Sequence, residues 1–279
     1  GKIVTRTYDN ADLLSGITDG IVPIRYTYSA DGQVASIAYP ALGKTLRYEY
    51  DWAGRLSQFS GVDGRPIRYE YDSRGRLSAV LLPEGKAVWF TYDPSGRVVA
   101  AQYPNGVRGA WKYNDLGKPL RITYTDGAGH AIAGWHYTYD ANGNPTEIRD
   151  TQGRLSRYGY DANGQLVEES GPTSLTHYSY HPGANRARLQ NRTAAIQYTY
   201  NSGGQLLQAG DETFAYDANG NILERRSVRG VTRYQYDSTN RLIKVATRDG
   251  NEVNFGYDPH GNRMWRSDRN GTTHYVTDG

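Results

Sequence analysis

The chain has no cysteine, and only four phenylalanines and one methionine among its 279 residues. Without cysteine, no disulfide can brace the fold and no thiol can act as a nucleophile or metal ligand. Hydrophobic residues make up only 37% of the chain, which is little for a compact globule of this length with a deep aliphatic core. The composition therefore favours thin layers of structure with half-buried faces.

Long apolar runs and blocks of like charge are also missing. No stretch approaches the roughly 18 apolar residues of a membrane helix, and no signal peptide is visible, so we predict no membrane span. The 32 basic and 29 acidic residues are interleaved, which argues against a phosphate-binding stripe and predicts no nucleic-acid partner. Because repeats begin by residue 26 of a chain that starts at Gly1, we expect the segment to come from a longer protein.

Tyrosine and glycine are abundant instead, with 25 and 33 copies. An aromatic-x-Tyr triplet recurs twelve times, mostly every 20 to 22 residues, with one gap of 26 and one of 16. The triplets end at Tyr28, Tyr50, Tyr71, Tyr92, Tyr113, Tyr139, Tyr160, Tyr180, Tyr200, Tyr216, Tyr236 and Tyr257. Because side chains alternate along a strand, both rings of a triplet project from one face. We predict that these tyrosines form a structural aromatic ladder from repeat to repeat.

A turn follows each triplet. The residue after the tyrosine is aspartate in eight repeats, and we predict that these carboxylates cap the turn: Asp51, Asp72, Asp93, Asp140, Asp161, Asp217, Asp237 and Asp258. Three residues later, ten repeats carry a glycine that supplies positive φ: Gly32, Gly54, Gly75, Gly96, Gly117, Gly143, Gly164, Gly204, Gly220 and Gly261. Ala184 and Asn240 occupy this position in the other two repeats. The next residue is always Arg, Lys, Gln or Asn.

This local pattern predicts a β-hairpin in every repeat. A second turn, marked by glycines such as Gly64 and Gly106, usually lies halfway to the next triplet. No segment has a helical apolar period of useful length. We therefore predict an all-β fold of about two dozen short antiparallel strands with almost no helix. Since a lone hairpin is marginally stable, the repeats must pack on one another as a β-solenoid or a spiral shell.

The pattern of residues 68–77, Arg-Tyr-Glu-Tyr-Asp-x-x-Gly-Arg-Leu, resembles the Rhs/YD-repeat family. This family includes bacterial polymorphic toxins, C components of insecticidal toxin complexes and animal teneurins. The resemblance implies a hairpin ribbon that spirals into a hollow shell, often around a toxic polypeptide. It divides the chain into a lead-in or partial first repeat (1–25), one array of about twelve repeats (26–265) and a truncated approach to a C-terminal core (266–279).

Motifs that would carry catalysis or metal binding are missing. The six histidines have no zinc spacing. Residues 140–151 fail as a calcium loop, because glycine is fourth where an EF-hand requires it sixth, and residue 151 is Thr instead of Glu. Nucleophile elbows and phosphate-binding loops are also absent from the sequence. We predict no catalytic residue, no metal site and no cofactor.

Three functional hypotheses follow, in decreasing order of support. The first is a structural wall segment of a secreted or cell-surface protein, whose partner is an enclosed polypeptide or a neighbouring shell segment. The second is a surface adhesion module that binds glycans through exposed aromatic rings, among which Trp52, inside a D-x-x-G turn, is the best candidate contact. The third is a hydrolase or lyase built on a solenoid. The sequence does not determine which face of the ribbon is interior.

Overall fold

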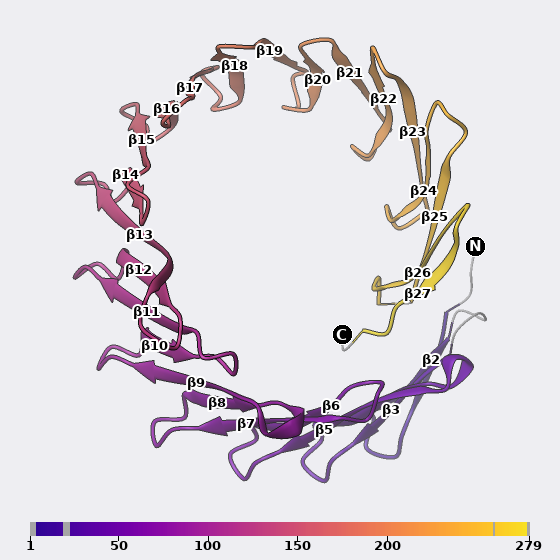
Figure 1. The fold of residues 1–279 in the computed structure, drawn as a ribbon. Coiled ribbons are helices and arrows are strands. Elements are labelled where there is room, and N and C mark those ends of the chain that lie inside the picture. The colour runs from indigo at the N-terminus through magenta and orange to yellow at the C-terminus, as the bar shows by residue number, and fades with distance from the viewer. Residues whose placement is uncertain (1–3, 19–22, 259, 278–279) are drawn as a thin grey trace. The chain divides into compact units, whose positions relative to one another are not determined.

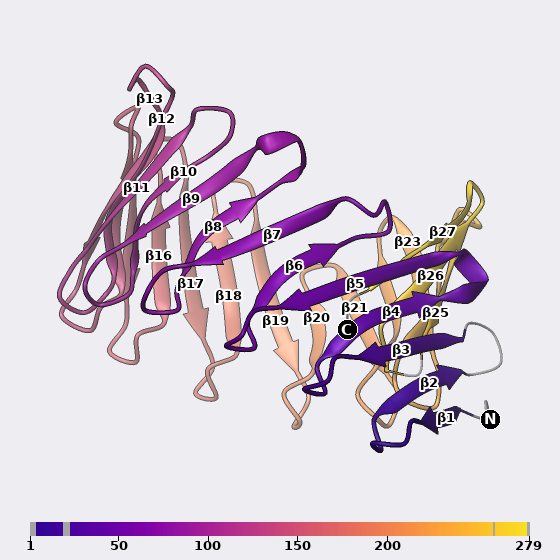
Figure 2. The same cartoon turned by 90° about the horizontal axis from the view of Figure 1, so that it is seen from below.

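The computed structural model describes residues 4–18, 23–258 and 260–277 and is built almost entirely from β-strands. Consecutive strands follow one another along the chain as hairpins (Figures 1 and 2). The helical residues of the described segments belong to two single 3-10 turns, η1 (Pro40–Leu42) and η2 (Pro83–Gly85). The predicted all-β fold of antiparallel hairpins with almost no helix is confirmed.

The first half of the chain contains strands β1 (Thr5–Tyr8), β2 (Leu14–Thr18), β3 (Ile24–Tyr28), β4 (Val34–Tyr39), β5 (Lys44–Tyr50), β6 (Leu56–Ser60), β7 (Pro66–Tyr71), β8 (Leu77–Leu81), β9 (Ala87–Tyr92), β10 (Val98–Gln102), β11 (Arg108–Tyr113), β12 (Pro119–Thr125) and β13 (Ala131–Tyr139). The second half contains β14 (Pro145–Asp150), β15 (Leu155–Tyr160), β16 (Leu166–Ser170), β17 (Leu175–Tyr180), β18 (Arg186–Asn191), β19 (Ala195–Tyr200), β20 (Leu206–Ala209), β21 (Glu212–Tyr216), β22 (Ile222–Ser227), β23 (Gly230–Tyr236), β24 (Leu242–Ala246), β25 (Glu252–Tyr257), β26 (Arg263–Asp268) and β27 (Gly271–His274).

Each triplet strand ends in the same kind of turn, as the β5–β6 hairpin illustrates. The Gly54 N–H donates to the Asp51 carbonyl at 2.9 Å, and the Asp51 N–H donates to the Arg55 carbonyl at 2.9 Å. The pairing register shifts by one residue at Tyr50, which lies opposite Leu56. A three-residue loop with a final left-handed residue produces this bulged hairpin, and Gly54 has a φ of 74°.

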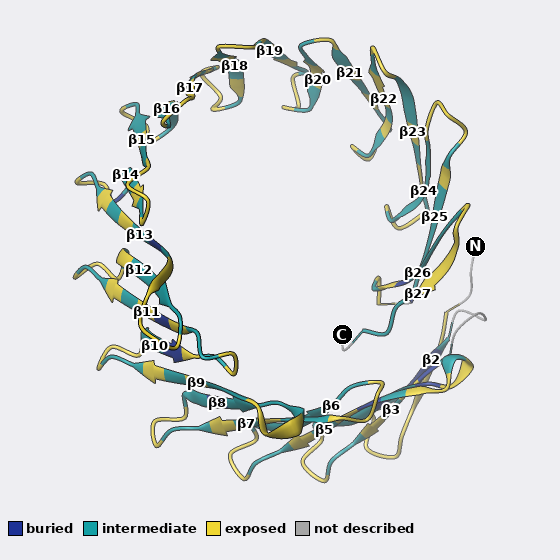
Figure 3. Ribbon diagram, in the orientation of Figure 1, coloured by how far each residue is buried: buried dark blue, intermediate teal, exposed yellow. Residues whose placement is uncertain are grey.

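The strands form a single layer whose two faces differ in chemistry. On β17, β18 and β19, Tyr178, Leu189 and Ile196 lie opposite one another and are half-buried. Arg188 and Gln197, on the other face of the same strands, are exposed. The alternation continues along many of the strands (Figure 3). One face of the layer is therefore aromatic and aliphatic, and the other is polar.

The chain divides into two compact units. Unit 1 comprises residues 1–70, 81–85 and 214–279, and unit 2 comprises residues 71–80 and 86–213. Unit 1 has a small core, consisting of Ile17, Ile24, Ile37, Tyr39, Leu46 and Met264. In unit 2, the buried hydrophobic residues among those described are Ala79 and Ala101. Unit 2 is thus a single sheet layer without a deep core, as the low aliphatic content predicted.

The array of hairpins extends beyond residues 26–265. Strands β1 and β2 enclose a turn in which the Asp12 N–H donates to the Asp9 carbonyl at 3.1 Å and Asp12 has a φ of 59°. This turn has the same hydrogen bonds as the twelve predicted turns, although its left-handed position holds an aspartate. A further hairpin, β26–β27, extends past residue 265 at the other end.

The left-handed turn position predicts opposite effects for two substitutions. Gly96 has a φ of 83° and an added Cβ would meet no atom within 4 Å, whereas Ala184 already holds a φ of 66°. We expect Gly96→Ala to lower the free energy of unfolding by about 1 kcal/mol and Ala184→Gly to raise it by a similar or smaller amount. Urea unfolding measures both, and equal midpoints for the two variants and the parent would contradict the conformational argument.

Candidate functional site: the tyrosine clamp and the buried carboxylate

All eight predicted turn-capping aspartates accept hydrogen bonds from their own turn. In the β5–β6 turn, Oδ1 of Asp51 accepts the N–H groups of Ala53 and Arg55, at 2.9 and 3.0 Å. The bond from the residue four positions later recurs in the other seven turns, at 2.8 to 3.0 Å. The carboxylate thus satisfies backbone donors that the turn would otherwise leave to water.

In seven of these eight turns, the second carboxylate oxygen also binds the side chain four residues later. Asp72 Oδ2 accepts Nε of Arg76 at 2.7 Å, and Asp237 Oδ2 accepts Nε of Arg241 at 2.7 Å. Hydrogen bonds from the Arg76 side chain and backbone lower the pKa of Asp72. Burial raises the pKa of Asp237, but hydrogen bonds from Arg241 and Thr239 outweigh that effect and lower it to about 2. Both carboxylates are therefore ionised at neutral pH.

The same arginines also reach the next repeat. Nη1 of Arg76 donates to the Asp93 carbonyl at 3.1 Å, and the Arg76 guanidinium lies 4.6 Å from the centre of the Tyr92 ring. Arg241 repeats this arrangement with the Asp258 carbonyl, at 2.9 Å, and the Tyr257 ring, at 5.3 Å. Each arginine thus combines an ion pair in its own turn with a cation–π contact and a backbone hydrogen bond in the following one.

The tyrosine at the end of a triplet makes a contact in the opposite direction, with the preceding repeat. Its hydroxyl donates to the carbonyl of the aliphatic or proline residue that follows the previous turn. Eight such bonds, of 2.6 to 2.9 Å, are described: Tyr28 to Leu14, Tyr50 to Val34, Tyr92 to Leu77, Tyr113 to Val98, Tyr139 to Pro119, Tyr160 to Pro145, Tyr180 to Leu166 and Tyr257 to Leu242. We call this hydroxyl bond, with the arginine where one is present, the tyrosine clamp.

The clamp differs from the ladder of ring contacts that the sequence led us to expect. The contact that recurs between repeats joins a phenol hydroxyl to a backbone carbonyl. Ring contacts occur more locally, as between Trp111 and Tyr124, whose centres are 5.8 Å apart, and between Tyr137 and Tyr139, at 6.5 Å. The residue four positions after the aspartate has a role that the sequence pattern did not lead us to predict. This position is restricted to Arg, Lys, Gln and Asn. Because all four side chains donate hydrogen bonds, that restriction could have indicated a side-chain bond to the aspartate.

The structure shows the backbone conformation of the predicted turn glycines and the exposure of the tryptophans. All ten glycines have a φ between 74° and 94°, a region that penalises other residues. Trp52 is 96% exposed in its turn, whereas Trp89 is 48% exposed and Trp111, Trp135 and Trp265 are half-buried. The glycan-contact role of Trp52 stays a prediction. In the described segments, no group of three or more His, Asp or Glu side chains is arranged to hold a metal ion.

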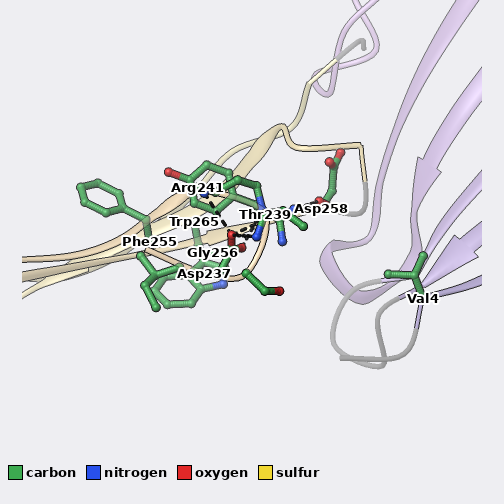
Figure 4. A pocket seen from close by; sticks show the side chains of 11 residues that line it. Val4, Asp237, Thr239, Arg241, Phe255, Gly256, Asp258 and Trp265 are labelled. Atoms are coloured by element: carbon green, nitrogen blue, oxygen red, sulfur yellow. Dashed lines mark hydrogen bonds and ion pairs between the residues drawn. The ribbon is translucent and has the colours of Figure 1, made fainter. Parts of the chain in front are cut away.

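A cavity of about 450 Å³ lies in unit 1 beside the last clamp. Figure 4 shows Arg241 and Asp237 joined at this cavity, with Trp265 and Phe255 also lining it. The Trp265 indole packs directly against the backbone of Gly256. A side chain at residue 256 would prevent this, because its Cβ would lie 2.0 Å from Nε1 of Trp265. Asp258, which also lines the cavity, is only 4% exposed.

Removing single clamp hydroxyls should destabilise the protein measurably. In Tyr92→Phe and Tyr113→Phe, the Leu77 and Val98 carbonyls lose their donors, and we expect each variant to lose about 1 kcal/mol of unfolding free energy in urea titrations. Tyr103→Phe is the matched control, because the described structure gives the Tyr103 hydroxyl no hydrogen bond. Losses no larger than that of the control would contradict the clamp.

Acid should weaken the turns that ionised aspartates cap. A carboxylate whose folded pKa is depressed stabilises the protein above its unfolded pKa, near 3.9, and this stability is lost as the pH falls toward the folded value. For Asp237 that window runs from about pH 4 to about 2. We expect the urea midpoint to fall across this range, and Asp237→Asn to show a shallower pH dependence. An identical slope in the variant would contradict the assignment.

Comparison with known proteins places this architecture in a family. The Teneurin YD-shell family model matches residues 1–129 and 146–276, and the RHS Repeat model matches residues 113–155. The segment between the two YD-shell matches contains the whole of β13, which at nine residues is the longest strand described. β13 also lies within the 26-residue gap in the triplet spacing, which runs from Tyr113 to Tyr139.

Two curated proteins are similar to part of the chain. Double-stranded DNA deaminase toxin A of Burkholderia cenocepacia is 30% identical over 117 residues, which are 41% of this chain and 8% of that protein. Teneurin-1 of Mus musculus is 31% identical over 129 residues, which are 44% of this chain and 4% of that protein. The matched stretches are thus a small part of these relatives' length.

Solved structures share the fold over nearly the whole chain. The Photorhabdus luminescens Tc holotoxin pore superimposes with a TM-score of 0.66 at 15% identity, over 94% of this chain and 17% of that one. The TcdB2–TccC3 crystal structure gives a TM-score of 0.62 at 17% identity, over 98% of this chain and 16% of that one. With the family model matched from residue 1 to residue 276 except for one internal segment, this chain belongs to the Teneurin YD-shell family.

Proposed function

We propose that this chain is a wall segment of a YD shell and that, in the full-length protein, it holds or shields another polypeptide. The observation that carries the proposal is the tyrosine clamp, which is described at eight of the twelve triplets and ties a hairpin to the one before it. Because the clamp acts between neighbours within one sheet, the array extends without a second layer of structure. A thin sheet of this kind is suited to enclosing space and poorly suited to building a catalytic cleft.

The aromatic face gives such a wall a surface for contact with a polypeptide. In unit 2, residues such as Tyr178, Leu189 and Ile196 remain half-buried, with no second layer of unit 2 over them. Tyrosine combines an apolar ring with a polar hydroxyl, and it therefore contacts both apolar and polar side chains. A face of this composition would accommodate a polypeptide of varied sequence.

The relatives support a toxin-like setting for the wall. One curated relative is named as a deaminase toxin, and the similar solved structures are of Tc toxin components. On this basis we propose that the cargo is a polypeptide and that the full-length protein is secreted or displayed at the cell surface. None of the described helices is long and apolar enough to span a membrane.

Protease protection in the full-length protein tests the proposal. Tyr92→Phe, Tyr113→Phe and Tyr139→Phe together remove three adjacent clamp bonds, and Tyr103→Phe is the control. We expect the shielded polypeptide to resist protease in the parent and the control, and to be cleaved at least about tenfold faster in the triple variant, because opening of the wall becomes more frequent. Equal cleavage rates in the parent and the triple variant, or no protected polypeptide in the parent, would refute the shielding role.

A further inference from the structure

Asp258 differs from the other turn-capping aspartates in its surroundings. It is the one buried polar or charged residue among those described, with 4% of its surface exposed. Its Oδ1 accepts the Asn262 N–H at 2.8 Å and its Oδ2 accepts the Asn262 amide at 3.1 Å. The partner four residues later is thus a neutral amide, where Asp237 has the guanidinium of Arg241.

No described cation neutralises the Asp258 carboxylate. Arg241 lies close to the residue, but its Nη1 binds the Asp258 carbonyl while its Nε binds Asp237. Figure 4 shows the Asp258 carboxylate directed away from the Arg241 side chain. Buried carboxylates in proteins are normally paired, because an isolated buried charge costs several kcal/mol. The two Asn262 bonds use only part of the accepting capacity of a carboxylate.

A cavity of about 380 Å³ in unit 1 borders this carboxylate. Tyr26, Tyr28 and Tyr39, from strands β3 and β4, line it together with Asp258 and His260. The Tyr28 hydroxyl donates to the Leu14 carbonyl at 2.8 Å and the Tyr39 hydroxyl donates to the Thr277 carbonyl at 2.7 Å. Two of the three phenols are therefore held by backbone bonds at their hydroxyl ends.

The third phenol stays neutral. Burial, followed by the neighbouring Tyr39 and Asp258, raises the pKa of Tyr26 to about 12. The His260 ring meets the Tyr26 ring edge-on, with centres 6.2 Å apart. The cavity thus combines a single carboxylate with three electron-rich aromatic rings. Aromatic rings beside a carboxylate are the surroundings in which proteins bind organic ammonium groups.

We propose that this cavity binds a primary alkylammonium group, such as the end of a lysine side chain. The ammonium would supply the positively charged partner that the Asp258 carboxylate lacks among the described residues. The methylene chain attached to it would lie against the tyrosine rings. An inorganic cation fits less well, because Asp258 is the one carboxylate in the lining and hard metal ions require several oxygen ligands. The volume lies within the range of small-ligand sites, roughly 300 to 1,000 Å³.

Titration with small amines tests the site. The probes are n-butylammonium and the capped peptide acetyl-Gly-Lys-Gly-amide, and the control is the same peptide with norleucine in place of lysine. We expect calorimetry to detect binding of one or both amines and at least about tenfold weaker binding of the norleucine peptide. Binding of the free amine alone would assign the site to small amines, and binding of the peptide would assign it to lysine side chains. Equal affinity for the lysine and norleucine peptides, or binding of neither amine, would overturn the proposal.

Two variants separate the site from the turn. Asp258→Asn removes the carboxylate, and Asp217→Asn is the matched control, because Asp217 makes the same two bonds to Asn221, at 2.8 and 2.9 Å, but does not line the cavity. We expect Asp258→Asn to weaken amine binding at least about tenfold and Asp217→Asn to leave it unchanged. Tyr26→Leu, which keeps the turn, should weaken binding as well. Unchanged affinity in both Asp258→Asn and Tyr26→Leu would overturn the assignment.

Discussion

The hydrogen bond from a tyrosine hydroxyl to a carbonyl of the preceding repeat is the interaction on which this protein depends. Strand pairing alone joins hairpins side by side and leaves each turn free to move relative to the next. Where it is described, the clamp ties the end of a triplet strand to the residue after the previous turn, as Tyr92 does with Leu77. Phenylalanine would bury a similar ring but could not donate this bond, which gives a physical reason for tyrosine at the triplet ends.

The turn aspartate and the residue four positions later extend the same connection. Where that residue is arginine, one side chain neutralises its own turn and contacts the next repeat, as Arg76 does with Asp72 and Asp93. Where it is asparagine, the turn keeps its hydrogen bonds and the carboxylate keeps its charge. In the half-exposed turns, water can solvate that charge. Asp258 is buried and borders a cavity, and there the same local chemistry provides the carboxylate of the proposed ammonium site.

In a chain held by contacts between neighbouring repeats, the stability comes from local interactions. Unit 2 has almost no buried side chains among its described residues, and its hairpins are stabilised by strand pairing, turn caps and clamps. Such an array behaves as a sum of repeats and interfaces, so the loss of one clamp weakens one junction while the others remain. This property suits a wall, because each segment contributes to the enclosure without a shared core.

The local structure of this protein can be predicted from its repeat pattern alone. Period-two aromatics define the strands, and the D-x-x-G spacing defines turns whose geometry is closed by residues at most four positions apart. The contacts between those units depend instead on how distant segments pack. Asp140, Asp217 and Asp258 all occupy D-x-x-G-N turns, yet only Asp258 is buried. The cause is packing between segments more than 200 residues apart, where the Tyr39 hydroxyl reaches the Thr277 carbonyl, and no local pattern encodes such a distant contact.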